Sequence, residues 1–187
     1  MIENALRYSH TLLKSTIING DKVIDATVGN GGDTVLLAKL VGKTGHLFGF
    51  DVQAQAIKTT KEKLLFTGLL QQVSLYNEGH EKLNLFVPAN IEIAAAVFNL
   101  GYLPTGDKQI ITKGETTIQA IEIILPRLRK GGLIVLTVYS GHPEGDLEKS
   151  AILEFTKQLS QDLFTVLYYG FINQKNSPPF LIAIEKR

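Results

Sequence analysis

A short apolar segment followed by a glycine-rich turn occupies positions 22 to 34, Lys22-Val-Ile-Asp-Ala-Thr-Val-Gly-Asn-Gly-Gly-Asp-Thr34. Its first part predicts a buried strand over 22–27, and the turn Val28-Gly-Asn-Gly-Gly-Asp33 leads into a helix predicted over 34–41. Glycine has no side chain, so backbone N–H groups in such a turn can approach a ligand closely. In open α/β sheets, ligands bind beyond the carboxyl ends of the strands, which is where this turn lies.

The rest of the chain continues the alternation of apolar strands and helices. Further strands are predicted at 45–50, 73–76, 91–99, 133–139, 164–172 and 179–185, and further helices at 5–18, 54–67, 116–128 and 146–161. Strands that alternate with helices indicate βαβ units and a parallel sheet. The last two strands have no helix between them, so we expect a hairpin that puts one antiparallel strand at or near the sheet edge. Pro126 predicts a kink or an early end in its helix.

The composition fits one globular domain over residues 1–187, because 44% of the residues are hydrophobic and 20% are charged. The net charge of +1 gives no general basic surface, so any contact with RNA would depend on a local patch. The sequence holds no cysteine, which excludes disulfides, thiolate metal sites and a cysteine nucleophile. Its four histidines lack the spacing of metal ligands, so no metal is expected.

The sequence gives no sign of export or of membrane insertion. The first residues lack the pattern of a secretory signal, and no apolar run is long enough to cross a bilayer. We therefore expect a cytoplasmic protein without a membrane partner.

The glycine-rich turn is not a complete dinucleotide-binding motif, because Thr34 occupies the position of the third glycine. Carboxylates at Asp25 and Asp33 would repel a pyrophosphate, but they can pair with the ammonium group of S-adenosylmethionine. Asp51 ends the second predicted strand and can accept hydrogen bonds from ribose hydroxyls, as it could for NAD too. The order of these residues favours a methyltransferase. The predicted cofactor-binding residues are Asp25, Thr27, Gly29, Asn30, Gly31, Asp33, Thr34, Asp51, Gln53, Glu78, Gly79 and His80.

The third predicted strand ends in Asn77-Glu-Gly-His80, which supplies the last three of these cofactor candidates. A polar residue at that position commonly faces the adenine. The alternative is a surface turn, which asparagine and glycine favour in any case.

The fourth predicted strand ends in Phe98-Asn-Leu-Gly-Tyr-Leu-Pro104. Amino methyltransferases carry an Asn-Pro-Pro-Tyr-like motif here, in which the asparagine holds the target nitrogen and the ring stacks on the base. Asn99 and Tyr102 match that pattern, whereas Leu100 and Gly101 replace the two prolines. The alternative is a strand-end turn with a tyrosine facing solvent.

A second polar loop, Thr137-Val-Tyr-Ser-Gly-His-Pro-Glu-Gly145, follows the fifth predicted strand at the same edge of the sheet. His142 could orient the substrate or accept a proton, or it could simply structure the loop. The predicted catalytic residues are Asn99, Tyr102 and His142, and the predicted substrate-binding residues are Leu103, Pro104, Tyr139, Glu144 and Lys175.

These motifs, together with Phe50-Asp-Val-Gln53 and Glu115-Thr-Thr-Ile-Gln-Ala120, resemble a small bacterial family labelled putative rRNA methylases. The resemblance covers nearly the whole chain. It implies a Rossmann-like class I methyltransferase with a seven-stranded, mostly parallel sheet and S-adenosylmethionine as cofactor. The family includes the Gram-positive methyltransferase that converts 5-aminomethyl-2-thiouridine, at the tRNA wobble position, to its 5-methylaminomethyl form. The resemblance therefore implies a primary amine as acceptor, the anticodon stem-loop of tRNA as partner, and a homodimer.

Three alternatives stay open at the level of the sequence. The acceptor could be rRNA or a small amine, or the protein could bind S-adenosylmethionine and act as a regulator without catalysis. An NAD-dependent dehydrogenase is the third alternative, and Thr34 in place of glycine disfavours it.

Overall fold

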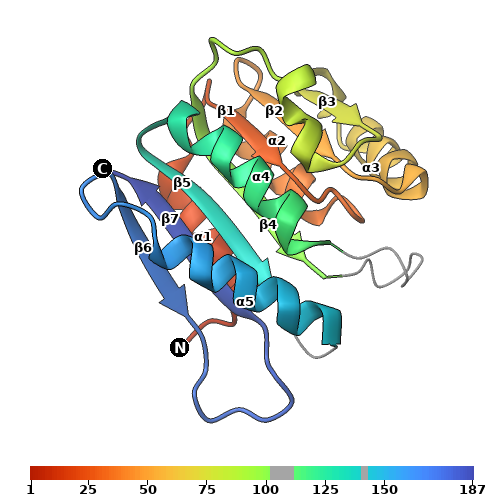
Figure 1. Cartoon of the computed structure of the whole chain (residues 1–187). Helices are drawn as coiled ribbons and strands as arrows, with labels where there is room; N and C mark the ends of the chain where they lie inside the picture. Colours follow the sequence, from red (N-terminus) through yellow and green to blue (C-terminus); the bar gives the residue numbers. More distant parts are fainter. Residues whose placement is uncertain (102–111, 140–142) are drawn as a thin grey trace.

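The computed structural model describes residues 1–101, 112–139 and 143–187, without the side chains of 143 and 144. Within these residues seven strands form one sheet in the order β3-β2-β1-β4-β5-β7-β6 (Figure 1). The strands are β1 (Lys22–Asp25), β2 (His46–Phe50), β3 (Val73–Tyr76), β4 (Ile93–Leu100), β5 (Leu128–Val138), β6 (Phe164–Tyr169) and β7 (Phe180–Lys186). The helices are α1 (Ala5–Thr16), α2 (Gly32–Val41), α3 (Ala54–Phe66), α4 (Gly114–Ile124) and α5 (Pro143–Lys157), and the short 3₁₀ helices are η1 (Leu70–Gln72), η2 (His80–Leu85) and η3 (Leu125–Arg127).

The strand directions confirm the predicted α/β fold. Strands β3, β2, β1, β4 and β5 run parallel, and β7 pairs antiparallel with both β5 and β6. The C-terminal hairpin therefore places its antiparallel strand next to the edge of the sheet, and β6 forms the edge itself.

Helices cover both faces of the sheet (Figure 1). On one face, Leu13 of α1, Leu37 of α2 and Leu64 of α3 pack in one buried apolar cluster. On the other, Ile121 of α4 and Ile152 of α5 belong to a second cluster. The parallel strands are therefore buried on both sides, which explains why β4 reads as a continuous apolar run. Within the described residues, no helix is both long and apolar enough to span a membrane.

Several element boundaries differ from the sequence prediction, and two of the differences have a clear physical reason. Helix α4 ends at Ile124, and Pro126 lies in the 3₁₀ turn η3, so the predicted early end is confirmed. Strand β5 begins at Leu128, earlier than predicted, because Leu128 already pairs with Ile93 ahead of an irregularity in the register. Gly131 has a φ of 71° in this irregular stretch, a backbone conformation that favours glycine.

The sheet register brings the predicted functional segments to one edge. Asp25 at the end of β1 lies between Gly49 of β2 and Val97 of β4, and Asn99 near the end of β4 pairs with Thr137 of β5. This carboxyl edge is where ligands bind in parallel α/β sheets.

Helix α1 is fastened to the same region by Tyr169, which ends β6. The ring of Tyr169 lies 4.3 Å from that of Tyr8, centroid to centroid, and its hydroxyl donates to the carbonyl oxygen of Glu3 at 2.6 Å. The start of α1 thus lies beside the carboxyl edge of the sheet.

Candidate active site

The turn after β1 is tied to the end of β2 by Asp51. The carboxylate accepts from the backbone N–H of Gly29 through Oδ2 and from that of Gln53 through Oδ1, each at 2.8 Å. Burial raises the pKa of Asp51, and the two N–H donors oppose that rise. Each carboxylate oxygen can accept a second hydrogen bond, so Asp51 can still accept hydrogen bonds from the hydroxyl groups of a ligand beside the turn.

Two adjacent glycines of the turn differ in the space around them. Gly31 has a φ of 76°, and a Cβ there would lie 2.5 Å from Oγ1 of Thr60, so only glycine fits. A Cβ on the exposed Gly32 would meet nothing within 4 Å. Gly32 begins α2, so the backbone N–H groups of this helix face an open approach.

Asp25 and Thr34 lie beneath the turn, with no exposed surface. The hydroxyl of Thr34 donates to Oδ2 of Asp25 at 2.6 Å, and the N–H of Thr27 donates to Oδ1 at 3.2 Å. Burial, followed by the charge of Asp33, raises the pKa of Asp25 to about 7. Asp25 and Thr34 therefore support the turn from inside the protein, and their direct contact with a ligand stays a prediction.

A second polar group is centred on Asp33 at the start of α2. Oδ2 of Asp33 accepts from Nδ2 of Asn99 at 2.7 Å, and Oδ1 lies 2.6 Å from Nε2 of His10 in α1. The backbone N–H of Asn99 donates to the hydroxyl of Thr27 at 2.7 Å. Asn99 Oδ1 is buried and has no hydrogen-bond partner within the described residues. The end of β4 thus presents a fixed amide whose oxygen is available to a ligand.

Tyr139, directly after β5, flanks this group. Its side chain is partly exposed, and burial together with the charge of Asp33 raises its pKa. The N–H of Tyr139 donates to the carbonyl of Leu100 at 2.9 Å, and a Cβ on Gly101 would lie 3.3 Å from the Tyr139 Cβ. Replacement of a motif proline by Gly101 therefore lets the ends of β4 and β5 approach closely.

The residues after β3 take supporting positions. Glu78 pairs with Lys82 at 2.6 Å on the surface, and Gly79 precedes the short helix η2. His80 is buried and its Nδ1 donates to the carbonyl of Ala26 at 2.9 Å. Burial lowers the pKa of His80, which favours the neutral ring. Contact of these residues with adenine stays a prediction.

Some of the remaining predicted residues are described by the structure, and others are not. Gln53 is partly buried beside Asp51, and Asn30 is exposed, with its carbonyl accepting from Lys63. Lys175 is exposed in the loop that joins β6 to β7, which returns to the carboxyl edge. Tyr102, Leu103, Pro104 and His142 lie outside the described residues, as does the side chain of Glu144.

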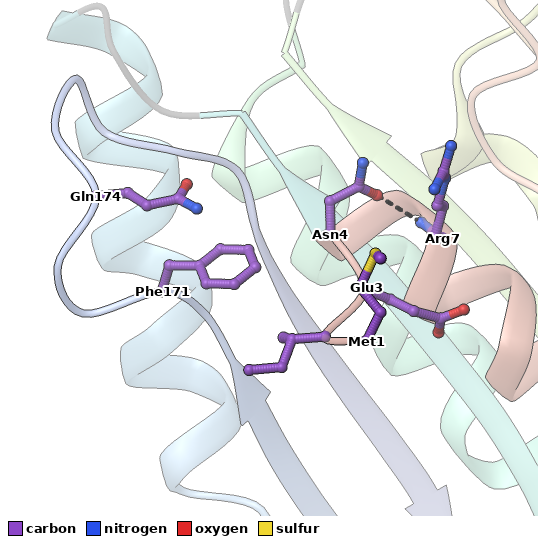
Figure 2. Close-up of a pocket in the computed structure, with 7 residues that line it drawn as sticks. Met1, Glu3, Asn4, Arg7, Phe171 and Gln174 are labelled. Carbon is purple, nitrogen blue, oxygen red and sulfur yellow. Dashed lines mark hydrogen bonds between the residues drawn. The ribbon is translucent and has the colours of Figure 1, made fainter.

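A cavity of about 450 Å³ lies between the first residues of the chain and the β6–β7 loop (Figure 2). Figure 2 shows Phe171 and Gln174 on one side of it, with Asn4 and Arg7 on the other. No predicted site residue lines this cavity. It is therefore separate from the group around Asp33.

One member of the polar group, His10, was missed by sequence reasoning. It lies in the middle of an amphipathic helix far from every recognised motif. Only the packing of α1 against the sheet brings it to Asp33, so no local sequence signal could have found it.

Known proteins that are similar to this chain are methyltransferases and putative methylases. The model of the family described as "Putative rRNA methylase" matches residues 47–185. The chain belongs to this family. It is 34% identical over 98% of its length to a chloroplastic tRNA (mnm(5)s(2)U34)-methyltransferase of Arabidopsis thaliana, of which the match covers 70%.

Two solved structures extend over the whole of this methylase. One is a putative rRNA-methylase from Clostridium thermocellum, 44% identical, with a TM-score of 0.97 and full coverage of both chains. The other is a putative methyltransferase from Streptococcus mutans in complex with SAH, also 44% identical, with a TM-score of 0.91 and full coverage of both. This methylase is therefore an S-adenosylmethionine-dependent methyltransferase.

The structure fits that cofactor. Asp51 has spare acceptor capacity, and the start of α2 is open at Gly32. No phosphate has to be held beside the carboxylates of Asp33 and Asp51, because S-adenosylmethionine carries none. Within the described residues, no three histidine, cysteine, aspartate or glutamate side chains are grouped to hold a metal ion.

Proposed function

We propose that this methylase transfers a methyl group to the primary amine of 5-aminomethyl-2-thiouridine at the tRNA wobble position, giving 5-methylaminomethyl-2-thiouridine. The observation that carries the proposal is the buried Asn99 Oδ1, which has no partner within the described residues and lies at the end of β4. The name of the Arabidopsis relative, a tRNA (mnm(5)s(2)U34)-methyltransferase, supports the same substrate.

The cofactor lies across the turn after β1 in this proposal. Asp51 accepts hydrogen bonds from the ribose hydroxyls, with Gln53 beside it, and the residues after β3 face the adenine. The methionine carboxylate lies at the open start of α2 near Gly32, where helix N–H groups and the helix dipole favour an anion. Bound there, the cofactor supplies an electrophilic methyl group on a sulfonium.

The acceptor amine lies against Asn99. Its N–H donates to Oδ1, which aims the nitrogen lone pair and reduces the freedom of the reacting group. The amine reacts in its neutral form, because a protonated amine has no lone pair. The predicted substrate side further comprises Tyr102, Leu103, Pro104, Tyr139, His142, Glu144 and Lys175. In this proposal Tyr102 packs against the base, and Tyr139 and His142 close the pocket from the neighbouring loop.

Incubation with labelled S-adenosylmethionine and total tRNA from cells that lack this protein tests the proposal. Nucleoside mass analysis should show a gain of one methyl group on 5-aminomethyl-2-thiouridine. Parallel reactions with rRNA and with small primary amines serve as comparisons. Label in rRNA alone would contradict the proposal and indicate rRNA methylation, the reaction that the family description names.

A cofactor-binding regulator without catalysis is the other candidate. It predicts S-adenosylmethionine binding with no transfer to any of the three acceptor pools. The position of Asn99 disfavours it, because a regulator has no need of a buried acceptor that lacks a partner among the described residues.

A further inference from the structure

His10 joins the polar group from a different layer of the protein. Its Nε2 lies 2.6 Å from Asp33 Oδ1, and the two side chains are 30% and 11% exposed. Helix α1, which carries His10, packs on β4, β5 and β7. The contact therefore links the first helix to the centre of the acceptor site.

The chemistry of the carboxylate fixes the direction of both its hydrogen bonds. An ionised Asp33 can only accept, so the atom of His10 that faces it carries a hydrogen, and the atom of Asn99 that faces it is Nδ2. With Nδ2 directed at Asp33, the other end of the amide, Oδ1, has no hydrogen-bond partner among the residues that the structure describes. A flipped amide would set two oxygens against each other at 2.7 Å.

We propose that His10 is a positioning residue for methyl transfer, acting through Asp33 to hold the Asn99 amide with its oxygen toward the acceptor amine. This proposal rests on the proposed function. In this role His10 acts through Asp33 and needs no contact of its own with substrate or cofactor. It restrains Asp33 Oδ1 so that Oδ2 stays aligned with Asn99, and a charge-assisted bond is strong enough for that task.

A plain structural role for His10 makes a different prediction. If the contact only fastened α1 to α2, its loss would lower stability and leave the turnover of the folded enzyme unchanged. A positioning role instead predicts a lower kcat, with little change in the affinity for S-adenosylmethionine.

The test compares His10→Ala with His10→Gln, since the glutamine amide can still donate to Asp33. We expect kcat for tRNA methylation to fall at least 10-fold in His10→Ala and to recover to within about 3-fold of wild type in His10→Gln. His46→Ala is the matched control, because His46 is also a partly buried histidine with a side-chain hydrogen-bond partner, Ser74 at 2.9 Å, but lies at the start of β2.

A double-mutant cycle tests the route of the effect. If His10 acts through Asn99, then His10→Ala should cause no further loss in an Asn99→Ala background. Independent, multiplicative losses would overturn the proposal.

A readout on the protein alone separates this inference from the proposed function. The side-chain amide protons of Asn99, followed by NMR, should shift and exchange faster in His10→Ala and stay near their wild-type state in His10→Gln. An unchanged amide signal and unchanged kcat in His10→Ala would overturn the positioning role. If the wild-type enzyme methylated no tRNA, the proposed function would be overturned instead. The His10–Asp33 contact would then have no role in methyl transfer to tRNA.

Discussion

The backbone N–H of Gly29 donates a 2.8 Å hydrogen bond to Oδ2 of Asp51, which joins the turn after β1 to the end of β2. Asp51 also accepts from the N–H of Gln53. One carboxylate therefore holds both the turn after β1 and the end of β2, and its loss should affect cofactor binding more than the loss of any single predicted contact would.

We expect Asp51→Ala to weaken S-adenosylmethionine binding at least 10-fold by calorimetry, because the ribose acceptor and the restraint on the turn are lost together. Some stability should be lost as well, about 1–3 kcal/mol for the unpaired backbone donors. Asp21→Ala is the control, since Asp21 makes comparable contacts with Ile18 and Arg129 at the opposite edge of the sheet. Equal cofactor affinity in both variants would contradict the assignment.

The paired glycines of the turn should respond in opposite ways to alanine. Gly31→Ala should lose about 1–3 kcal/mol of stability, since its φ is positive and the new Cβ would collide with Thr60. Gly32→Ala should keep or slightly raise stability, because it lies in a helix with open space around it. If the ligand fills that space, cofactor affinity should nevertheless fall in Gly32→Ala. Urea unfolding and calorimetry on both variants separate the two effects.

Asn99→Ala should lower the turnover for tRNA methylation about 100-fold, the order typical of removing one preorganised hydrogen-bonding group. The affinity for S-adenosylmethionine should stay nearly unchanged. Asn19→Ala is the control, because its side chain bonds Thr44 away from the site. Wild-type turnover in Asn99→Ala would remove this residue from the acceptor site.

The buried Asp25 should make stability depend on pH. Its pKa is raised from 3.8 to about 7, so the folded protein holds this proton more tightly than the unfolded chain does. The resulting stability is fully present below about pH 4 and is lost as the pH rises through 7, at about 1.4 kcal/mol per pKa unit. Asp25→Asn mimics the neutral acid, so its stability relative to wild type should increase from pH 4 to pH 8.

Urea unfolding of both proteins at several pH values measures that difference, because contributions from other ionisable groups cancel between them. A difference that stays constant from pH 4 to pH 8 would show that Asp25 titrates normally in the folded protein.

The fold was accessible from the sequence because each βα unit carries its own local signals. The apolar strand before Asp25, the glycine turn and the acid at 51 occur in chain order, and the sheet register then brings them together. The turn itself was also predictable, because Gly29 and Gly31 adopt positive φ values, which glycine reaches more easily than other residues.

The contacts that set side-chain orientation could not be predicted in the same way. His10 reaches Asp33 because α1 packs on strands formed much later in the chain, where Tyr8 also contacts Tyr169. The burial of Asp25 likewise depends on its neighbours β2 and β4 in the sheet, and a short sequence motif carries no information about them. Residue type and order were readable, whereas the direction in which each side chain points depended on tertiary packing.

The position of β7 bears on how the chain assembles. It is the last strand in chain order, yet it lies inside the sheet, between β5 and β6, and contacts the first helix α1. During synthesis, α1 and β5 therefore emerge from the ribosome before the strand that covers them. Such long-range pairing is slow and leaves an unpaired, apolar strand edge exposed meanwhile. We therefore expect the insertion of β7 to be a late step of folding and one that is vulnerable to aggregation.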